Sequence, residues 1–130
     1  MNILVGYNGT NIGRDLLDLA IHRAKAYSGE IFVITSLMGS GKTNKEDISE
    51  AEKNLENAKK YLDEKGVVYQ THLLVRGSTP GEDIVNFARE NAIDEIAIGV
   101  KSRSKVGKLL FGSTAQYVIL KAECPVTSVK

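Results

Sequence analysis

The residues most able to do chemistry lie in one basic stretch with glycine at its edges, from Gly99 to Thr114. It follows the apolar run 96–98 and precedes a helical pattern at 115–122, so the order is strand, loop, helix. Small residues let a ligand approach the backbone, and free N–H groups at a helix N-terminus stabilise an anion. The loop also holds four cations: Lys101, Arg103, Lys105 and Lys108. The stretch predicts a phosphate site, which we interpret as a nucleotide site; the alternative is a solvated basic loop before a capped helix.

A second glycine-rich segment, Gly39-Ser40-Gly41-Lys42-Thr43, is similar to a P-loop. A P-loop needs a further glycine at position 36, where Ser36 stands, and the next helix is expected a few residues late, near Asn44 or Lys45. The pattern Thr43-x-x-Glu46 predicts a capping box for that helix. A flexible loop that could fold over a nucleotide is favoured over a true P-loop.

Other reactive side chains predict no catalytic residue and no metal site. His22 and His72 lack metal-ligand spacing, and Cys124, the only cysteine, is expected to be a buried thiol. A response regulator would need acids where Asn8 and Arg76 stand. Flavin binding and slow ATP hydrolysis are left open, because this architecture does not fix the ligand and phosphoryl transfer depends mainly on positioning.

The elements that position these residues follow from hydrophobic periodicity. Five apolar runs predict strands at 3–7, 31–35, 67–75, 93–98 and 125–129, and helical spacing predicts a helix between each pair. Thr79, Pro80 and Glu82 give three start signals for the third helix, and Ser113 with Gln116 predicts a cap for the fourth. Strict alternation indicates an α/β fold with a parallel sheet and helices on both faces, in which ligands bind beyond the carboxyl ends of the strands.

Composition limits the class of protein. The chain has 130 residues, 42% hydrophobic and 25% charged, with a net charge of +1, so we expect one globular domain over residues 1–130. This charge predicts no nucleic-acid or membrane partner. Because no signal peptide or membrane span is visible, a cytoplasmic location is expected.

Four segments make the chain similar to the universal stress proteins over essentially its whole length. They are residues 3–10, residues 75–80, residues 94–99, and Phe111-Gly112-Ser113-Thr114 with Cys124-Pro125-Val126. The nucleotide-binding branch of that family has the motif G-x2-G-x9-G-[ST]. Here it runs from Gly99 through Ser102 to Gly112 and Ser113, with the spacing intact.

The resemblance implies a flavodoxin-like, Rossmann-type five-stranded parallel sheet of order 3-2-1-4-5. It also implies a homodimer paired through the last strand, a role in the stress response as a nucleotide-dependent switch, and binding of ATP or AMP, with Mg²⁺ left open. By position, phosphate and ribose contacts fall to the loop and the following helix, and Ser36 lies near the adenine. The expected binding residues are Tyr7, Asn8, Ser36, Gly99, Ser102, Arg103, Gly112, Ser113 and Thr114.

Two positions depart from the family pattern. Asn8 stands where an Asp is usual, and it lacks the charge of a carboxylate. Ser102 adds a Cβ where glycine would allow close approach, although its hydroxyl could contact a phosphate. The second hypothesis is therefore a dimeric interaction module of the same fold that has lost nucleotide binding.

Overall fold

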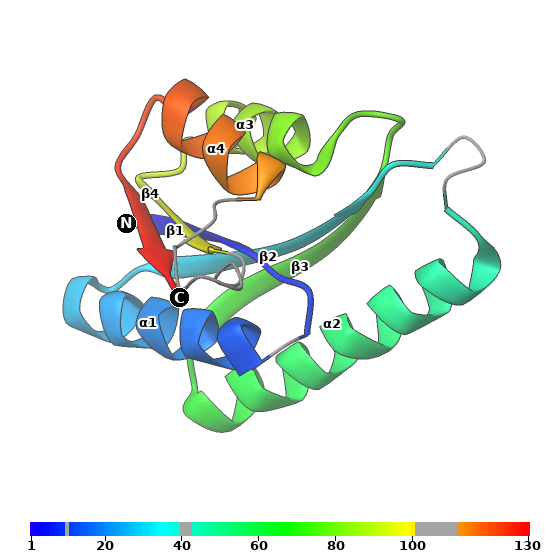
Figure 1. Ribbon diagram of the computed structural model, residues 1–130. Coiled ribbons are helices and arrows are strands. Elements are labelled where there is room, and N and C mark those ends of the chain that lie inside the picture. The colour runs from blue at the N-terminus through cyan, green and yellow to red at the C-terminus, as the bar shows by residue number, and fades with distance from the viewer. Residues whose placement is uncertain (10, 40–42, 101–111) are drawn as a thin grey trace, which may run out of the picture.

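Strands and helices alternate strictly in the computed structural model, which describes residues 1–9, 11–39, 43–100 and 112–130 (Figure 1). The strands are β1 (Asn2–Gly6), β2 (Glu30–Leu37), β3 (Val68–Val75), β4 (Glu95–Gly99) and β5 (Val126–Val129). The helices are α1 (Asn11–Tyr27), α2 (Lys45–Lys65), α3 (Pro80–Glu90) and α4 (Ser113–Lys121). The expected alternation is confirmed, with strand starts displaced by one or two residues.

The sheet has the order β3-β2-β1-β4-β5, and every neighbouring pair is parallel. This is the predicted flavodoxin-like order. β1 lies between β2 and β4, so the chain leaves β1 toward one side of the sheet and later returns to its other side. The carboxyl ends of these three strands therefore border the switch point, where this architecture places ligands.

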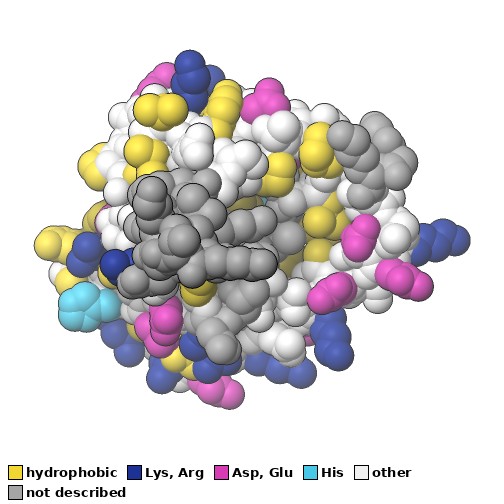
Figure 2. Space-filling view, in the orientation of Figure 1, with side chains coloured by type: hydrophobic (Ala, Val, Ile, Leu, Met, Phe, Trp, Pro, Cys, Tyr) yellow, Lys and Arg dark blue, Asp and Glu magenta, His cyan; other side chains and the backbone are white. Residues whose placement is uncertain are grey.

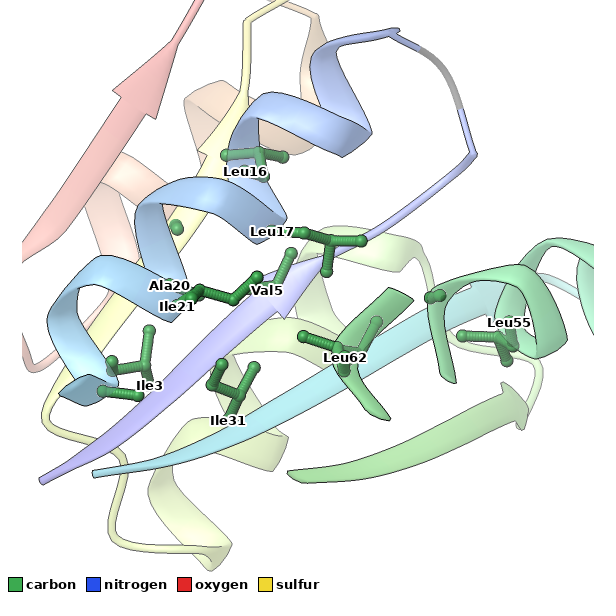
Figure 3. Close-up of a cluster of buried hydrophobic side chains, with 13 residues drawn as sticks. Ile3, Val5, Leu16, Leu17, Ala20, Ile21, Ile31, Leu55 and Leu62 are labelled. Atoms are coloured by element: carbon green, nitrogen blue, oxygen red, sulfur yellow. The ribbon is translucent and has the colours of Figure 1, made fainter. Parts of the chain in front are cut away.

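Alternate residues of the strands build two hydrophobic layers, because successive side chains point to opposite faces. Ile3 and Val5 of β1 face α1 and α2, whereas Leu4 faces α3 and α4. Figure 1 shows the two helix pairs on opposite sides of the sheet. Figure 3 shows the layer under α1 and α2, where Leu17 and Leu62 pack against the strands. The side chains that form the two layers are buried, so the strands are anchored on both faces.

The helix starts are defined by local hydrogen bonds. Thr79 and Glu82 form the predicted capping box of α3. The box expected at Thr43 and Glu46 is wrong by one residue, because the side chains of Asn44 and Asp47 cap α2 instead. The Thr43 hydroxyl is engaged elsewhere, since it accepts a hydrogen bond of 3.0 Å from the Gly39 N–H.

Close contacts fix the second helix pair and the sheet edge. A Cβ on Gly81 would come within 2.9 Å of the Tyr117 side chain, so α3 and α4 touch at this glycine. Glu95, buried in β4, accepts hydrogen bonds from Arg23 of α1 at 3.2 Å and from Thr127 of β5 at 2.6 Å. This carboxylate links one helix to two strands.

Positive and negative side chains are interspersed over the α1 and α2 side of the molecule (Figure 2). Among the described helices, none is long and apolar enough to cross a membrane.

Candidate functional site

A pocket of about 500 Å³ opens at the carboxyl edge of the sheet, at the switch point between β1 and β4. Its walls come from the ends of three strands, from the starts of α3 and α4, and from α1. The lining residues are Gly6, Tyr7, Asn8, Ile12, Leu16, Ile34, Thr35, Ser36, Leu37, Pro80, Ile84, Ile98, Gly99, Val100, Gly112, Ser113, Thr114 and Ala115. The pocket thus brings together residues more than a hundred positions apart in the sequence.

Seven of the expected binding residues line this pocket. They are Tyr7, Asn8, Ser36, Gly99, Gly112, Ser113 and Thr114. The other two, Ser102 and Arg103, lie outside the described residues, as do Lys101, Lys105 and Lys108.

Tyr7 is held at the end of β1 by backbone contacts with β2. Its N–H donates to the Ile34 carbonyl at 2.9 Å, and its own carbonyl accepts from the Thr35 hydroxyl at 2.8 Å. The ring packs over Gly13, where a Cβ would come within 2.8 Å of Tyr7 Cε1. Burial raises the pKa of the Tyr7 phenol, and the positive charge of Arg14 partly offsets this. Tyr7 therefore presents a neutral hydroxyl.

Asn8 follows Tyr7 at the exposed mouth of the pocket. Its carbonyl accepts a hydrogen bond of 3.4 Å from the Asn54 side chain of α2. Gly9 comes next with φ of 79°, in the left-handed region that favours glycine.

Ser36, at the carboxyl end of β2, donates its hydroxyl hydrogen to the carboxylate of Asp83 on α3. Asp83 is only 1% exposed. From the sequence, Asp83 and Glu82 are both interpreted as ordinary first-turn charges of a helix. The sequence does not predict the burial of Asp83, because only the fold places this turn beside β2. The one local sign of burial is that Asp83 directly precedes the buried Ile84.

The N-terminus of α4 differs from that of α3. The N-cap of α4 is Gly112, and no side chain caps the helix. The predicted cap by Ser113 with Gln116 is therefore wrong: Ser113 is the first helical residue, and a first-turn side chain does not take the N-cap role. This end of α4, at Gly112, Ser113 and Thr114, borders the pocket with the positive end of a helix dipole.

The remaining candidates lie elsewhere. Gly39 and Thr43, the described ends of the P-loop-like segment, do not line the pocket, and residues 40–42 fall outside the description. Cys124 is half-buried rather than buried, and burial raises the pKa of its thiol. Within the described part of the chain, no three or more His, Cys, Asp or Glu side chains gather as a metal cluster.

Comparison with known proteins decides the family. The model of the universal stress protein family matches residues 1–130. The chain belongs to this family. The resemblance seen in the sequence is thereby confirmed over the whole chain.

Three relatives document the similarity within the universal stress protein family. A solved universal stress protein of Archaeoglobus fulgidus is 40% identical, with a TM-score of 0.93, over 100% of this chain and 98% of the other. A second structure, of the universal stress protein from Archaeoglobus fulgidus in complex with dAMP, is 37% identical, with a TM-score of 0.87 and the same coverage. A universal stress protein of Methanocaldococcus jannaschii is 29% identical over 98% of this chain and 81% of its own length.

Proposed function

We propose that this universal stress protein binds an adenine nucleotide, ATP or AMP, in the pocket at the switch point. The observation that carries the proposal is the pocket itself, where seven residues expected from the sequence meet beside an uncapped helix N-terminus. The Archaeoglobus fulgidus protein that binds dAMP supports it, because its fold and length match and 37% of its residues are identical.

The two helix N-termini at the pocket indicate how the ligand is oriented. α3 is closed to an anion: Pro80 has no N–H, and the Thr79–Glu82 capping box places a carboxylate beside its first turn. The start of α4 has neither feature, because Gly112 offers no capping side chain. We therefore place the phosphate at Gly112, Ser113 and Thr114.

The base then lies at the β2 end of the pocket. Leu37, Pro80 and Ile84 provide apolar surface there, and Ser36 provides a hydroxyl. The ends of β2 and β4 are separated by β1, which puts them about 10 Å apart at the usual strand spacing. A mononucleotide extended across β1 spans such a distance from base to phosphate.

Ligand-dependent stability tests the binding. At a ligand concentration 100 times its dissociation constant, the free energy of unfolding should rise by about 2.7 kcal/mol. The purified protein would be melted with AMP, ADP and ATP, each with and without Mg²⁺, and the supernatant of denatured protein would be analysed for co-purified nucleotide. An unchanged melting temperature at millimolar nucleotide, with none co-purified, would contradict the proposal.

A variant identifies the loop that holds the phosphate. Gly112→Val places a branched side chain at the start of α4 and should remove the stabilisation by ATP and AMP. His22→Val, on the exposed face of α1 and outside the pocket, is the control and should keep it. Equal stabilisation of both variants would mean that the phosphate binds elsewhere.

The interaction-module hypothesis is separated from nucleotide binding by restoring the family pattern. Asn8→Asp and Ser102→Gly replace the two departures noted in the sequence. If the natural protein has lost the ability to bind nucleotide, ATP should stabilise only the double variant. Stabilisation of the unaltered protein by ATP would favour nucleotide binding over the interaction-module hypothesis.

We further propose a homodimer paired through β5. In the described sheet β5 is an edge strand, and Ile119 and Leu120 of the preceding helix are 44% and 77% exposed. An edge strand and exposed apolar side chains are both common features of a pairing surface.

A further inference from the structure

The pair formed by Ser36 and Asp83 gives the base end of the pocket a fixed hydrogen-bonding character. Asp83 is 1% exposed and sits in the first turn of α3, where the helix dipole favours a negative charge. The hydroxyl of Ser36, which lines the pocket, donates to one of its carboxylate oxygens. The wall residue is thus oriented by a carboxylate that does not itself line the pocket.

The direction of this hydrogen bond determines what Ser36 offers a ligand. A serine hydroxyl has one hydrogen and two lone pairs. With the hydrogen held by Asp83, Oγ can present only lone pairs to the pocket. Rotation of the hydroxyl toward a ligand would leave a buried carboxylate oxygen without its donor, which is costly.

Purine nucleotides differ in what their six-position presents to such an acceptor. Adenine carries an amino group, which donates, whereas hypoxanthine and guanine carry a carbonyl oxygen, which accepts. Two acceptors that face each other in a partly buried site leave both unpaired. A hydrogen-bonding wall of this kind discriminates more strongly than an apolar pocket does.

We propose that Ser36, oriented by Asp83, makes the pocket select 6-amino purine nucleotides over 6-oxo purine nucleotides. The inference rests on the proposed function, since it takes the base to lie at the β2 end of the pocket. Ser36 contacts the base, and Asp83 is a positioning residue that acts through it.

The dissociation constants of AMP and IMP, measured by titration calorimetry at fixed salt, give the readout. The two ligands share ribose and phosphate and differ only in the purine. The unaltered protein should bind AMP about tenfold more tightly than IMP, as expected for one mismatched hydrogen bond. Equal affinity for the two nucleotides would overturn the inference.

Two variants assign the selectivity. Ser36→Ala removes the acceptor, and Asp83→Ala frees the serine hydrogen to donate to a carbonyl, so each should reduce the AMP preference to about twofold or less. Glu90→Ala is the control, because it removes an equal charge from the same helix, away from the pocket, and leaves the Ser36–Asp83 bond in place. It should keep the natural preference.

The outcomes separate this inference from the function on which it rests. If Asp83 only ties β2 to α3, Asp83→Ala will lower the melting temperature and the preference will stay tenfold, which overturns its positioning role. If Asp83→Ala does not fold, Ser36→Ala decides alone, since an unchanged preference in that variant overturns the inference. Failure of the unaltered protein to bind either AMP or ATP would overturn the proposed function and the inference together.

Discussion

Two adjacent residues of β2, Thr35 and Ser36, make hydrogen bonds to different elements at the edge of the pocket. Thr35 is buried, and its hydroxyl binds the Tyr7 carbonyl, which joins the ends of β2 and β1. Ser36 points to the other face of the sheet and binds Asp83 of α3. Because successive strand residues alternate between faces, one dipeptide connects the pocket wall to β1 and to a helix on the opposite layer.

Gly99 provides a prediction at the scale of one residue. An ideal Cβ at this position would come within 2.6 Å of Ile12 Cγ2, so Gly99→Ala must displace Ile12, which also lines the pocket. Overpacking of this kind costs about 1–3 kcal/mol. We expect denaturant unfolding to show a loss of stability in that range, together with weaker nucleotide binding.

A second substitution checks the cause of that loss. Ile12→Ala removes the methyl group that the new Cβ would meet, so Gly99→Ala should cost less in the Ile12→Ala background than in the natural protein. Equal costs in the two backgrounds would show that Ile12 is not the obstacle.

The sequence predicted the members of the pocket better than their roles. Gly99 was expected to make room for a ligand, and the structure shows that it also makes room for Ile12. Asp83 was interpreted as an ordinary first-turn charge of a helix; it lies in that turn and is also buried. In both cases the additional finding is a contact between segments far apart in the sequence, which local patterns cannot report.

At the scale of elements, the starts of α3 and α4 differ: a capping box closes α3, whereas no side chain caps α4. The cap of α3 was predicted correctly because Thr79, Pro80 and Glu82 act within one turn. The caps of α2 and α4 were misplaced by one residue because the N-cap depends on which residue adopts the extended backbone. Gly112 does so, with φ of −68° and ψ of 164°, and Ser113 is therefore already helical.

The capping box of α3 should contribute measurably to stability. Thr79→Ala removes the hydroxyl that accepts from the Glu82 N–H at 3.3 Å, which should cost about 1 kcal/mol in the free energy of unfolding. Ser78→Ala, one residue outside the capping box, is the control and should change the urea midpoint little. A Thr79→Ala midpoint equal to that of the control would mean that solvent replaces the cap without cost.

At the scale of the whole molecule, the parallel sheet was predicted from the alternation of strands and helices, and its order from the family resemblance. Both are confirmed. The subunit arrangement depends on a second chain. Its prediction came from the family resemblance, and the position of β5 at an edge of the described sheet supports it.

The hydrogen-bond register of β5 identifies which of its groups face that free edge. The carbonyls of Pro125 and Val129 accept hydrogen bonds from the N–H groups of Ile96 and Val100. The backbone groups of the odd-numbered residues therefore face β4, and those of Ser128 face away from it. Backbone N–H and C=O groups of one strand residue lie on the same side. The N–H of Ser128 is therefore directed toward a partner strand and away from β4.

Ser128→Pro tests the proposed homodimer, because it removes this outward N–H while the β4 pairing keeps its donors and acceptors. In a two-fold symmetric dimer the loss occurs twice, so the dimer dissociation constant should rise by about 10- to 100-fold. Sedimentation velocity over a concentration series would measure the shift. Ser128→Ala keeps the N–H and should remain as dimeric as the natural protein. If Ser128→Pro melts like the natural protein and dimerises with the same affinity, the two subunits do not pair through β5.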